Sequence, residues 1–120
     1  MAERGKRAEG YCQEQRAAEY LQEKGYQILE RNFYSRYGEI DIIARDRQYL
    51  VFVEVKYRKS DRGGHPLEAV DRTKQRRICK TASWFLQRYG HLQETPCRFD
   101  VVGITDEEVI HIENAFCYIN

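Results

Sequence analysis

The segment Tyr49–Tyr57 constrains the fold more than any other part of the chain, because it is apolar on both sides of an extended strand. Side chains of a strand alternate between two faces. One face carries three valines, and the other carries an apolar pair followed by an ionisable pair: Val51, Val53 and Val55 against Leu50, Phe52, Glu54 and Lys56. Since both faces need covering, we expect this strand at the centre of a sheet with helices on each side.

The remaining elements follow from helix signals and strand patterns. Helix-favouring residues run from 8 to 24 and end before Gly25, and a second helix is predicted over Arg72–Tyr89 with Asp71 as its cap. Strands are predicted at residues 26–34, 38–44, 98–104 and 109–112, and the short polar segment 45–48 predicts a hairpin. With 120 residues the chain has room for one domain. We therefore predict a single α/β domain over residues 1–120, with a mixed sheet between layers of helices.

The chain shows the features of a cytoplasmic protein. No apolar run approaches the ~20 residues that span a bilayer, and the first seven residues are charged rather than apolar. The four cysteines are far apart, form no Cys-x-x-Cys pair, and are expected to be reduced and mostly buried: Cys12, Cys79, Cys97 and Cys117. No histidine lies near them at the spacing of a zinc site, so structural zinc is not expected. Trp84 is expected in the core and His111 at the surface.

Charge is distributed unevenly along the chain although the formal net charge is only +1. Residues 56–80 hold nine basic side chains against three acidic ones, whereas residues 81–120 hold two basic against six acidic ones. A basic segment of this kind suits a polyanion such as nucleic acid. A solvated basic helix face would give the same pattern, so charge alone does not choose between them.

Three ionisable residues interrupt the apolar strands of the predicted hairpin. Glu54 and Lys56 are two residues apart and project from one face, and hairpin pairing can bring Asp41 beside them. Carboxylates are hard oxygen ligands for Mg²⁺, and a lysine can position a water or stabilise charge that develops on phosphorus. A plain ion pair explains Glu-x-Lys by itself. The added aspartate, the hairpin and the basic segment favour a metal-dependent site for phosphodiester hydrolysis.

A family resemblance appears at these residues. Gly38-Glu39-Ile40-Asp41 followed by Val51-Phe52-Val53-Glu54-Val55-Lys56 resembles the Asp…Glu-x-Lys signature of the restriction-endonuclease-like superfamily. The chain more closely resembles the small uncharacterised bacterial YraN-like proteins, which are related to Holliday-junction resolvases. The resemblance covers nearly the whole chain and includes Glu14, Arg31-Asn32 and Arg98-Phe99-Asp100.

The resemblance implies a three-layer fold with a central mixed sheet and a Mg²⁺ site, which Mn²⁺ could also occupy, at the edge of the sheet. It also implies that Glu14 reaches this site from the first helix. By its position alone, Glu14 could equally be a buried hydrogen-bonded residue. Glu39 alternates to the same face as Asp41 and is either a neighbour of the site or part of the turn at Gly38.

We predict from these features an Mg²⁺-dependent endonuclease that acts on DNA, with branched DNA as a candidate substrate. Asp41 and Glu54 would hold the metal, and Lys56 and Glu14 would complete the catalytic set. Five basic residues would bind phosphates: Arg58, Lys59, Arg62, Lys74 and Arg77. Cleavage of a junction needs two active sites and therefore a homodimer. The main alternative is a non-catalytic nucleic-acid-binding accessory module, and the other is a protein-interaction domain that retains the acidic cluster.

Overall fold

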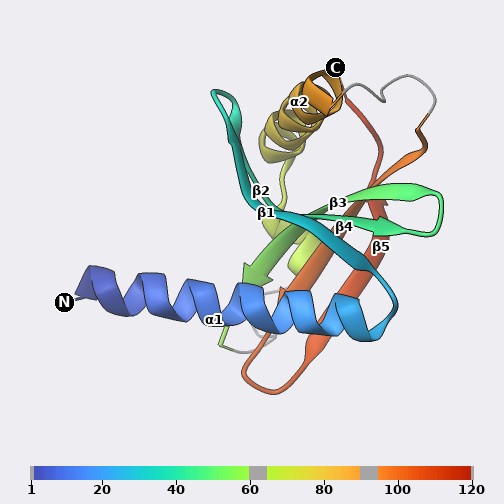
Figure 1. The fold of residues 1–120 in the computed structure, drawn as a ribbon. Coiled ribbons are helices and arrows are strands. Elements are labelled where there is room, and N and C mark those ends of the chain that lie inside the picture. Colours follow the sequence, from blue (N-terminus) through green and yellow to red (C-terminus); the bar gives the residue numbers. More distant parts are fainter. Residues whose placement is uncertain (1, 60–64, 90–94, 120) are drawn as a thin grey trace.

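The computed structural model describes residues 2–59, 65–89 and 95–119, which form one sheet with a long helix on either side (Figure 1). The elements follow in the order α1 (Ala2–Glu23), β1 (Gln27–Ser35), β2 (Gly38–Asp46), β3 (Tyr49–Tyr57), the short 3₁₀ helix η2 (Pro66–Ala69), α2 (Arg72–Tyr89), β4 (Cys97–Ile104) and β5 (Val109–Phe116). Every predicted helix and strand is present. The first helix begins at Ala2 and not at residue 8. The prediction relied on apolar periodicity, which residues 2–7 lack. These residues extend the helix because Ala, Glu, Arg and Lys favour it.

The sheet is mixed and has the order β1-β2-β3-β4-β5. β1 to β3 are antiparallel neighbours, β4 runs parallel to β3, and β5 returns antiparallel to β4. β3 is therefore the central strand, as its two apolar faces predicted. The parallel step from β3 to β4 passes through α2, which is the connection that such a step requires.

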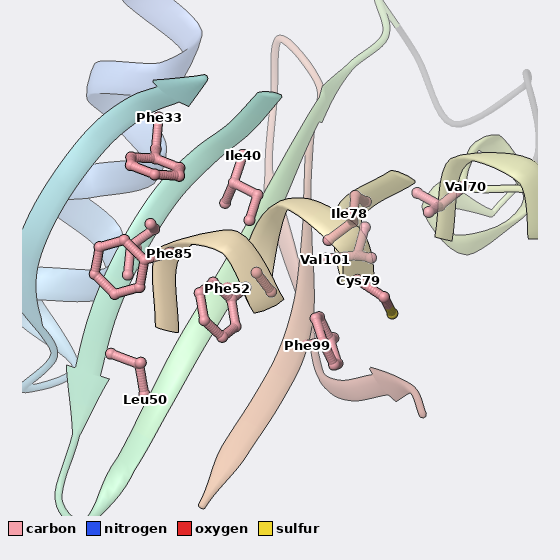
Figure 2. Packing of buried hydrophobic residues seen from close by; sticks show 12 residues of the cluster. Phe33, Ile40, Leu50, Phe52, Val70, Ile78, Cys79, Phe85, Phe99 and Val101 are labelled. Carbon is pink, nitrogen blue, oxygen red and sulfur yellow. The ribbon is translucent and has the colours of Figure 1, made fainter. Parts of the chain in front are cut away.

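The two faces of β3 belong to two separate apolar clusters. Val51 and Val53 pack with Ala17, Ala18 and Leu21 of α1 on one face. On the other face, Leu50 and Phe52 pack with residues of α2, and the ring of Phe85 meets that of Phe52 edge-on at 6.0 Å (Figure 2). The predicted three-layer α/β architecture is confirmed, and it is compatible with the restriction-endonuclease-like fold.

Both helices have the end signals that the sequence predicted. At the end of α1, Gly25 adopts a left-handed φ of 97°, and the Tyr26 amide donates to the Leu21 carbonyl at 2.9 Å. These are the features of a Schellman termination, in which glycine avoids the strain of a side chain. Before α2, the Asp71 carboxylate accepts a hydrogen bond from the Lys74 amide at 2.8 Å and so satisfies a free donor of the first turn.

A close contact fixes η2 against β4. A Cβ atom placed on Gly103 would lie 2.2 Å from Cγ of Pro66, which is well inside van der Waals contact. Glycine is therefore the residue that lets the proline ring rest on the strand. This contact positions the chain where it leads into α2.

A buried polar network lies at the other end of the sheet and links β4 and β5 to Asp46 of β2 and to Tyr26, which precedes β1. The carboxylate of Asp100, which is fully buried, accepts hydrogen bonds from Arg98 and from the Asn114 amide, and it bonds Nε2 of His111 at 2.8 Å. Arg98 also donates to Asp46 at 3.0 Å and bonds the hydroxyl of Tyr26. The prediction of a surface position for His111 is wrong, because its side chain is only 1% exposed.

Two other burial predictions are corrected. Trp84 is 45% exposed on α2 instead of buried in the core. The four cysteines are free, as expected, but two of them, Cys12 and Cys117, are exposed. No helix in the described ranges is long and apolar enough to cross a bilayer.

Candidate functional site

The site begins where β2 and β3 separate. Their pairing runs from Asp46↔Tyr49 to Ile42↔Val53, and the β1–β2 hairpin then turns away from β3 (Figure 1). The alternation of side chains is broken at the same point. Ile40 packs in the cluster under α2, whereas Ile42 packs in the cluster under α1. β2 therefore twists at Asp41. The opening that this leaves between β2 and β3 is reached from the α1 side and from the α2 side of the sheet.

Beyond the last β2–β3 pair, the side chain of Asp41 replaces a β2 backbone carbonyl as a hydrogen-bond acceptor. Its Oδ2 accepts a hydrogen bond of 2.8 Å from the backbone amide of Val55, a donor that regular pairing would satisfy with a β2 carbonyl. The carboxyl group also interacts with Glu54, which it would face if the register of β2 and β3 continued. A catalytic candidate thus also maintains the edge of β3.

Three carboxylates meet on the α1 side of this opening. Oxygens of Glu14, Glu39 and Asp41 lie within 4.8 Å of one another. With its amide NH₂ turned toward them, Asn32 of β1 donates to Glu39 at 2.7 Å and to Glu14 at 2.9 Å. Asn32 has a left-handed φ of 53°, a conformation that asparagine tolerates better than most residues. The neutral amide therefore holds two acidic side chains in place.

Glu54 lies on the α2 side of Asp41 and pairs with a lysine. Its side chain is 7% exposed, and Oε2 lies 3.3 Å from Nζ of Lys74, which α2 brings over the sheet. Lys56, two residues along the same face of β3, also contacts Lys74 through its side chain. The opening thus holds carboxylates toward α1 and a lysine pair toward α2, with Asp41 and Glu54 between them.

Burial and crowding shift the protonation of these acids. Burial, hydrogen bonding with Glu54 and repulsion by its charge raise the pKa of Asp41 to about 8. Burial and the charges of Asp41 and Glu39 raise the pKa of Glu14 to about 7, and burial also raises the pKa of Glu39. Without a cation, the site therefore resists carrying all of its negative charges at once.

The two lysines shift in opposite directions. Burial and contact with the Lys74 ammonium lower the pKa of Lys56. Burial opposes the charge on Lys74, but contact with Lys56 and the attraction of Glu54 outweigh it and raise the pKa of Lys74. Lys74 is accordingly the cation that neutralises Glu54.

The residues predicted to bind phosphate lie in different parts of the structure: at the end of β3, on the exposed side of α2 and inside the site. Arg58 and Lys59 follow Lys56 at the end of β3; Arg58 is half-buried and Lys59 is exposed. Arg77 is exposed on α2, with its Cβ 3.7 Å from the Cβ that a side chain at Gly38 would have. Lys74 lies inside the site, on Glu54, instead of on an outer face. Arg62 falls outside the described residues.

Two features were missed by reasoning from the sequence alone. The contact between Lys74 and Glu54 depends on how α2 crosses the sheet, and no local spacing signals that crossing. Asn32 gives a weak signal, because asparagine inside a strand pattern is a candidate for left-handed backbone. Glu39 shares the side of Asp41 as expected, and it is a full member of the carboxylate group.

Comparison with known proteins places this site within one family. The profile of the Uncharacterised protein family UPF0102 matches residues 13–104, which include every site residue described above. A UPF0102 protein of Lachnoclostridium phytofermentans is 54% identical over 111 residues, which cover 92% of this chain and 94% of that protein. The UPF0102 protein of Nitrosococcus oceani is 47% identical over 85% of this chain and 82% of its own length. That of Thermodesulfovibrio yellowstonii is 48% identical over 86% of this chain and 90% of its own length.

Proposed function

The chain belongs to the uncharacterised protein family UPF0102, and we propose that it is a metal-dependent endonuclease that hydrolyses phosphodiester bonds in DNA. The observation that carries the proposal is the opening between β2 and β3. Three carboxylates gather there within 4.8 Å, and two lysines approach from the other side. Oxygen ligands beside cationic side chains match the needs of a phosphodiester under attack by water.

The carboxylate group fits a divalent cation of the Mg²⁺ or Mn²⁺ type. Asp41, Glu14 and Glu39 offer oxygen ligands, and burial together with the charges of neighbouring carboxylates raises the pKa of all three. Glu54 is the further ligand expected from the sequence. It adjoins Asp41 but pairs with Lys74, so its use as a ligand requires that this ion pair loosen. When bound, the cation would polarise the phosphodiester and lower the pKa of a coordinated water.

The lysines complete the site from the α2 side. Lys56 lies beside Asp41 and Glu54 and is placed to orient the attacking water. Lys74 already pairs with Glu54. It supplies positive charge near the phosphorus atom, where negative charge increases in the transition state. Arg58 and Lys59, at the end of the same strand, are placed to hold the neighbouring phosphates.

The direct test is a cleavage assay with labelled DNA in Mg²⁺ and in Mn²⁺, using duplex, flap, four-way junction and single-stranded substrates. We expect cleavage that EDTA stops and that both Asp41→Asn and Lys56→Ala abolish. Glu107→Gln, which removes an exposed carboxylate from the β4–β5 turn, is the matched control and should retain full activity. Cleavage that persists in Asp41→Asn would refute this assignment of the site.

The same substrates separate the proposal from its alternative. Salt-sensitive binding without cleavage in either metal would indicate the accessory module, because phosphate contacts alone give binding of that kind. Junction cleavage further requires two sites in one particle. Light scattering of the protein on a four-way junction should therefore show two copies per junction if branched DNA is the substrate.

A further inference from the structure

Trp84 stands on the surface of α2 although a tryptophan is among the most costly side chains to leave in water. It is 45% exposed and is the only tryptophan in the chain. The neighbouring Phe85 carries the apolar packing of this turn, since its ring lies 5.2 Å from that of Phe33 and it is 8% exposed. Phe85 rather than Trp84 therefore packs toward the sheet, and the exposed part of Trp84 is available to a partner.

Two cationic side chains lie on the same side of α2 as this tryptophan. Arg77 and Lys80 precede it by seven and four residues, so they lie on the same side of the helix. The β1–β2 turn reaches toward α2 (Figure 1) and adds Arg36 and Tyr37, with Nζ of Lys80 at 5.4 Å and Cζ of Arg36 at 4.9 Å from the Tyr37 ring. We call these five residues the α2 flank. Each of its charged members is positive.

The α2 flank continues directly from the candidate active site. Lys74, which contacts Glu54, precedes Arg77 by one helical turn on the same helix. From Lys74 to Trp84 the helix axis rises by about 15 Å, at ~1.5 Å per residue. That distance equals about four nucleotides of a stacked strand at ~3.4 Å each.

We propose that the α2 flank binds a single-stranded segment of the DNA next to the cleavage site, with one unpaired base stacked on Trp84. Lys80, Arg77 and Arg36 hold its phosphates. The inference rests on the proposed function, because it names the kind of substrate that the same site would cut. Internal pairs of a duplex hide their base faces by stacking, whereas the unpaired bases of a flap or of the open centre of a junction present them. The flank therefore selects DNA with unpaired bases.

Binding is measured separately from cleavage by working in EDTA with the Asp41→Asn protein. Because Trp84 is the only tryptophan, fluorescence excited at the long-wavelength edge, where the nine tyrosines do not absorb, reports on it alone. We expect a thymidine 12-mer to quench this fluorescence at low salt and a blunt duplex to leave it nearly unchanged. Anisotropy of the labelled 12-mer should show that Trp84→Ala weakens single-strand affinity by about 5- to 150-fold, the effect of one stacked base. Trp84→Phe should recover part of it.

Charge variants test the phosphate contacts. Lys80→Ala should reduce the slope of log affinity against log salt by about 0.7 for the single strand. The matched control is Arg47→Asn, which removes one charge at the β2–β3 turn, where the left-handed φ of 58° accepts asparagine. This control should keep the slope, and circular dichroism should show all variants folded.

Several results would overturn the inference. The first is binding of the single strand without quenching of Trp84 fluorescence. The second is an equal loss of affinity for single strand and duplex in Trp84→Ala. The third is quenching that depends on protein concentration when no DNA is present. The last result would indicate that the flank is an interface between copies of the chain. Failure of the nuclease proposal is distinguishable, because it would appear as absent cleavage while the binding pattern held. An RNA 12-mer run in parallel shows whether the sugar matters.

Discussion

Replacing Asp41 by asparagine should abolish metal-dependent cleavage and at the same time stabilise the metal-free fold. Asparagine has nearly the same shape, and its carbonyl oxygen can still accept the 2.8 Å hydrogen bond from the Val55 amide. Its amide group can donate to the neighbouring carboxylates, as a protonated aspartic acid would. What the substitution removes is a carboxyl group that ionises easily in the unfolded chain and reluctantly in the folded one.

The size of the effect follows from the pKa of Asp41, which rises from 3.8 to about 8 on folding. Below pH ~4 both states carry the proton and Asp41 has no penalty. As pH rises toward 8, the unfolded chain releases the proton and the folded chain retains it, so the free energy of unfolding falls by at most about 1.4 kcal/mol per pH unit. At pH 7 the upper limit is about 4 kcal/mol.

Urea unfolding in EDTA, followed by circular dichroism at pH 5 and pH 8, measures this difference. Asp41→Asn should be more stable than the wild type at both values, by a margin that grows with pH. Adding Mg²⁺ at ten times its dissociation constant should stabilise the wild type by about 1.4 kcal/mol and leave the variant unchanged. A variant that is less stable than the wild type at pH 8, or a margin independent of pH, would refute the reasoning.

Three further substitutions probe other parts of the structure. Lys74→Ala should lower kcat by about 10²- to 10³-fold, the usual loss for one group that stabilises transition-state charge, with a smaller change in KM; an unchanged kcat would place Lys74 outside the chemistry. Asp100→Ala should lower the free energy of unfolding by about 3–5 kcal/mol, because Arg98 and His111 would remain buried without their carboxylate, and equal urea midpoints would contradict this. Gly103→Ala should lower it by about 1–3 kcal/mol, since the new methyl group would overlap the Pro66 ring; a melting temperature equal to that of the wild type would show that η2 moves aside freely.

The architecture was predictable from the sequence because its signals are local. Alternation marks the strands, two apolar faces mark β3 as central, and Gly25 and Asp71 mark helix ends. The placement of Glu54 and Lys56 on one side follows from the same alternation. These features depend on residues a few positions apart, where backbone geometry leaves little choice.

The missed features depend on contacts between distant segments. Trp84 is of a residue type expected in the core, but its neighbour Phe85 is the one that packs on Phe33 and Phe52 of the sheet. His111 looks like a surface residue by type, yet its partner Asp100 comes from the adjacent strand and buries it. Lys74 and Asn32 join the site only because α2 and β1 meet the same opening from opposite sides. No pattern within one element encodes those meetings.

The bond between the Val55 amide and the Asp41 carboxylate makes one backbone group a reporter of events in the site. Its proton is held by a side chain that would also bind a cation, so any loss of electron density from that oxygen weakens the bond. Amide hydrogen exchange at Val55, and the chemical shift of its nitrogen and proton, should therefore respond to metal binding before any substrate is present. A nuclear magnetic resonance titration could then follow occupancy of the site through an atom that takes no part in the reaction.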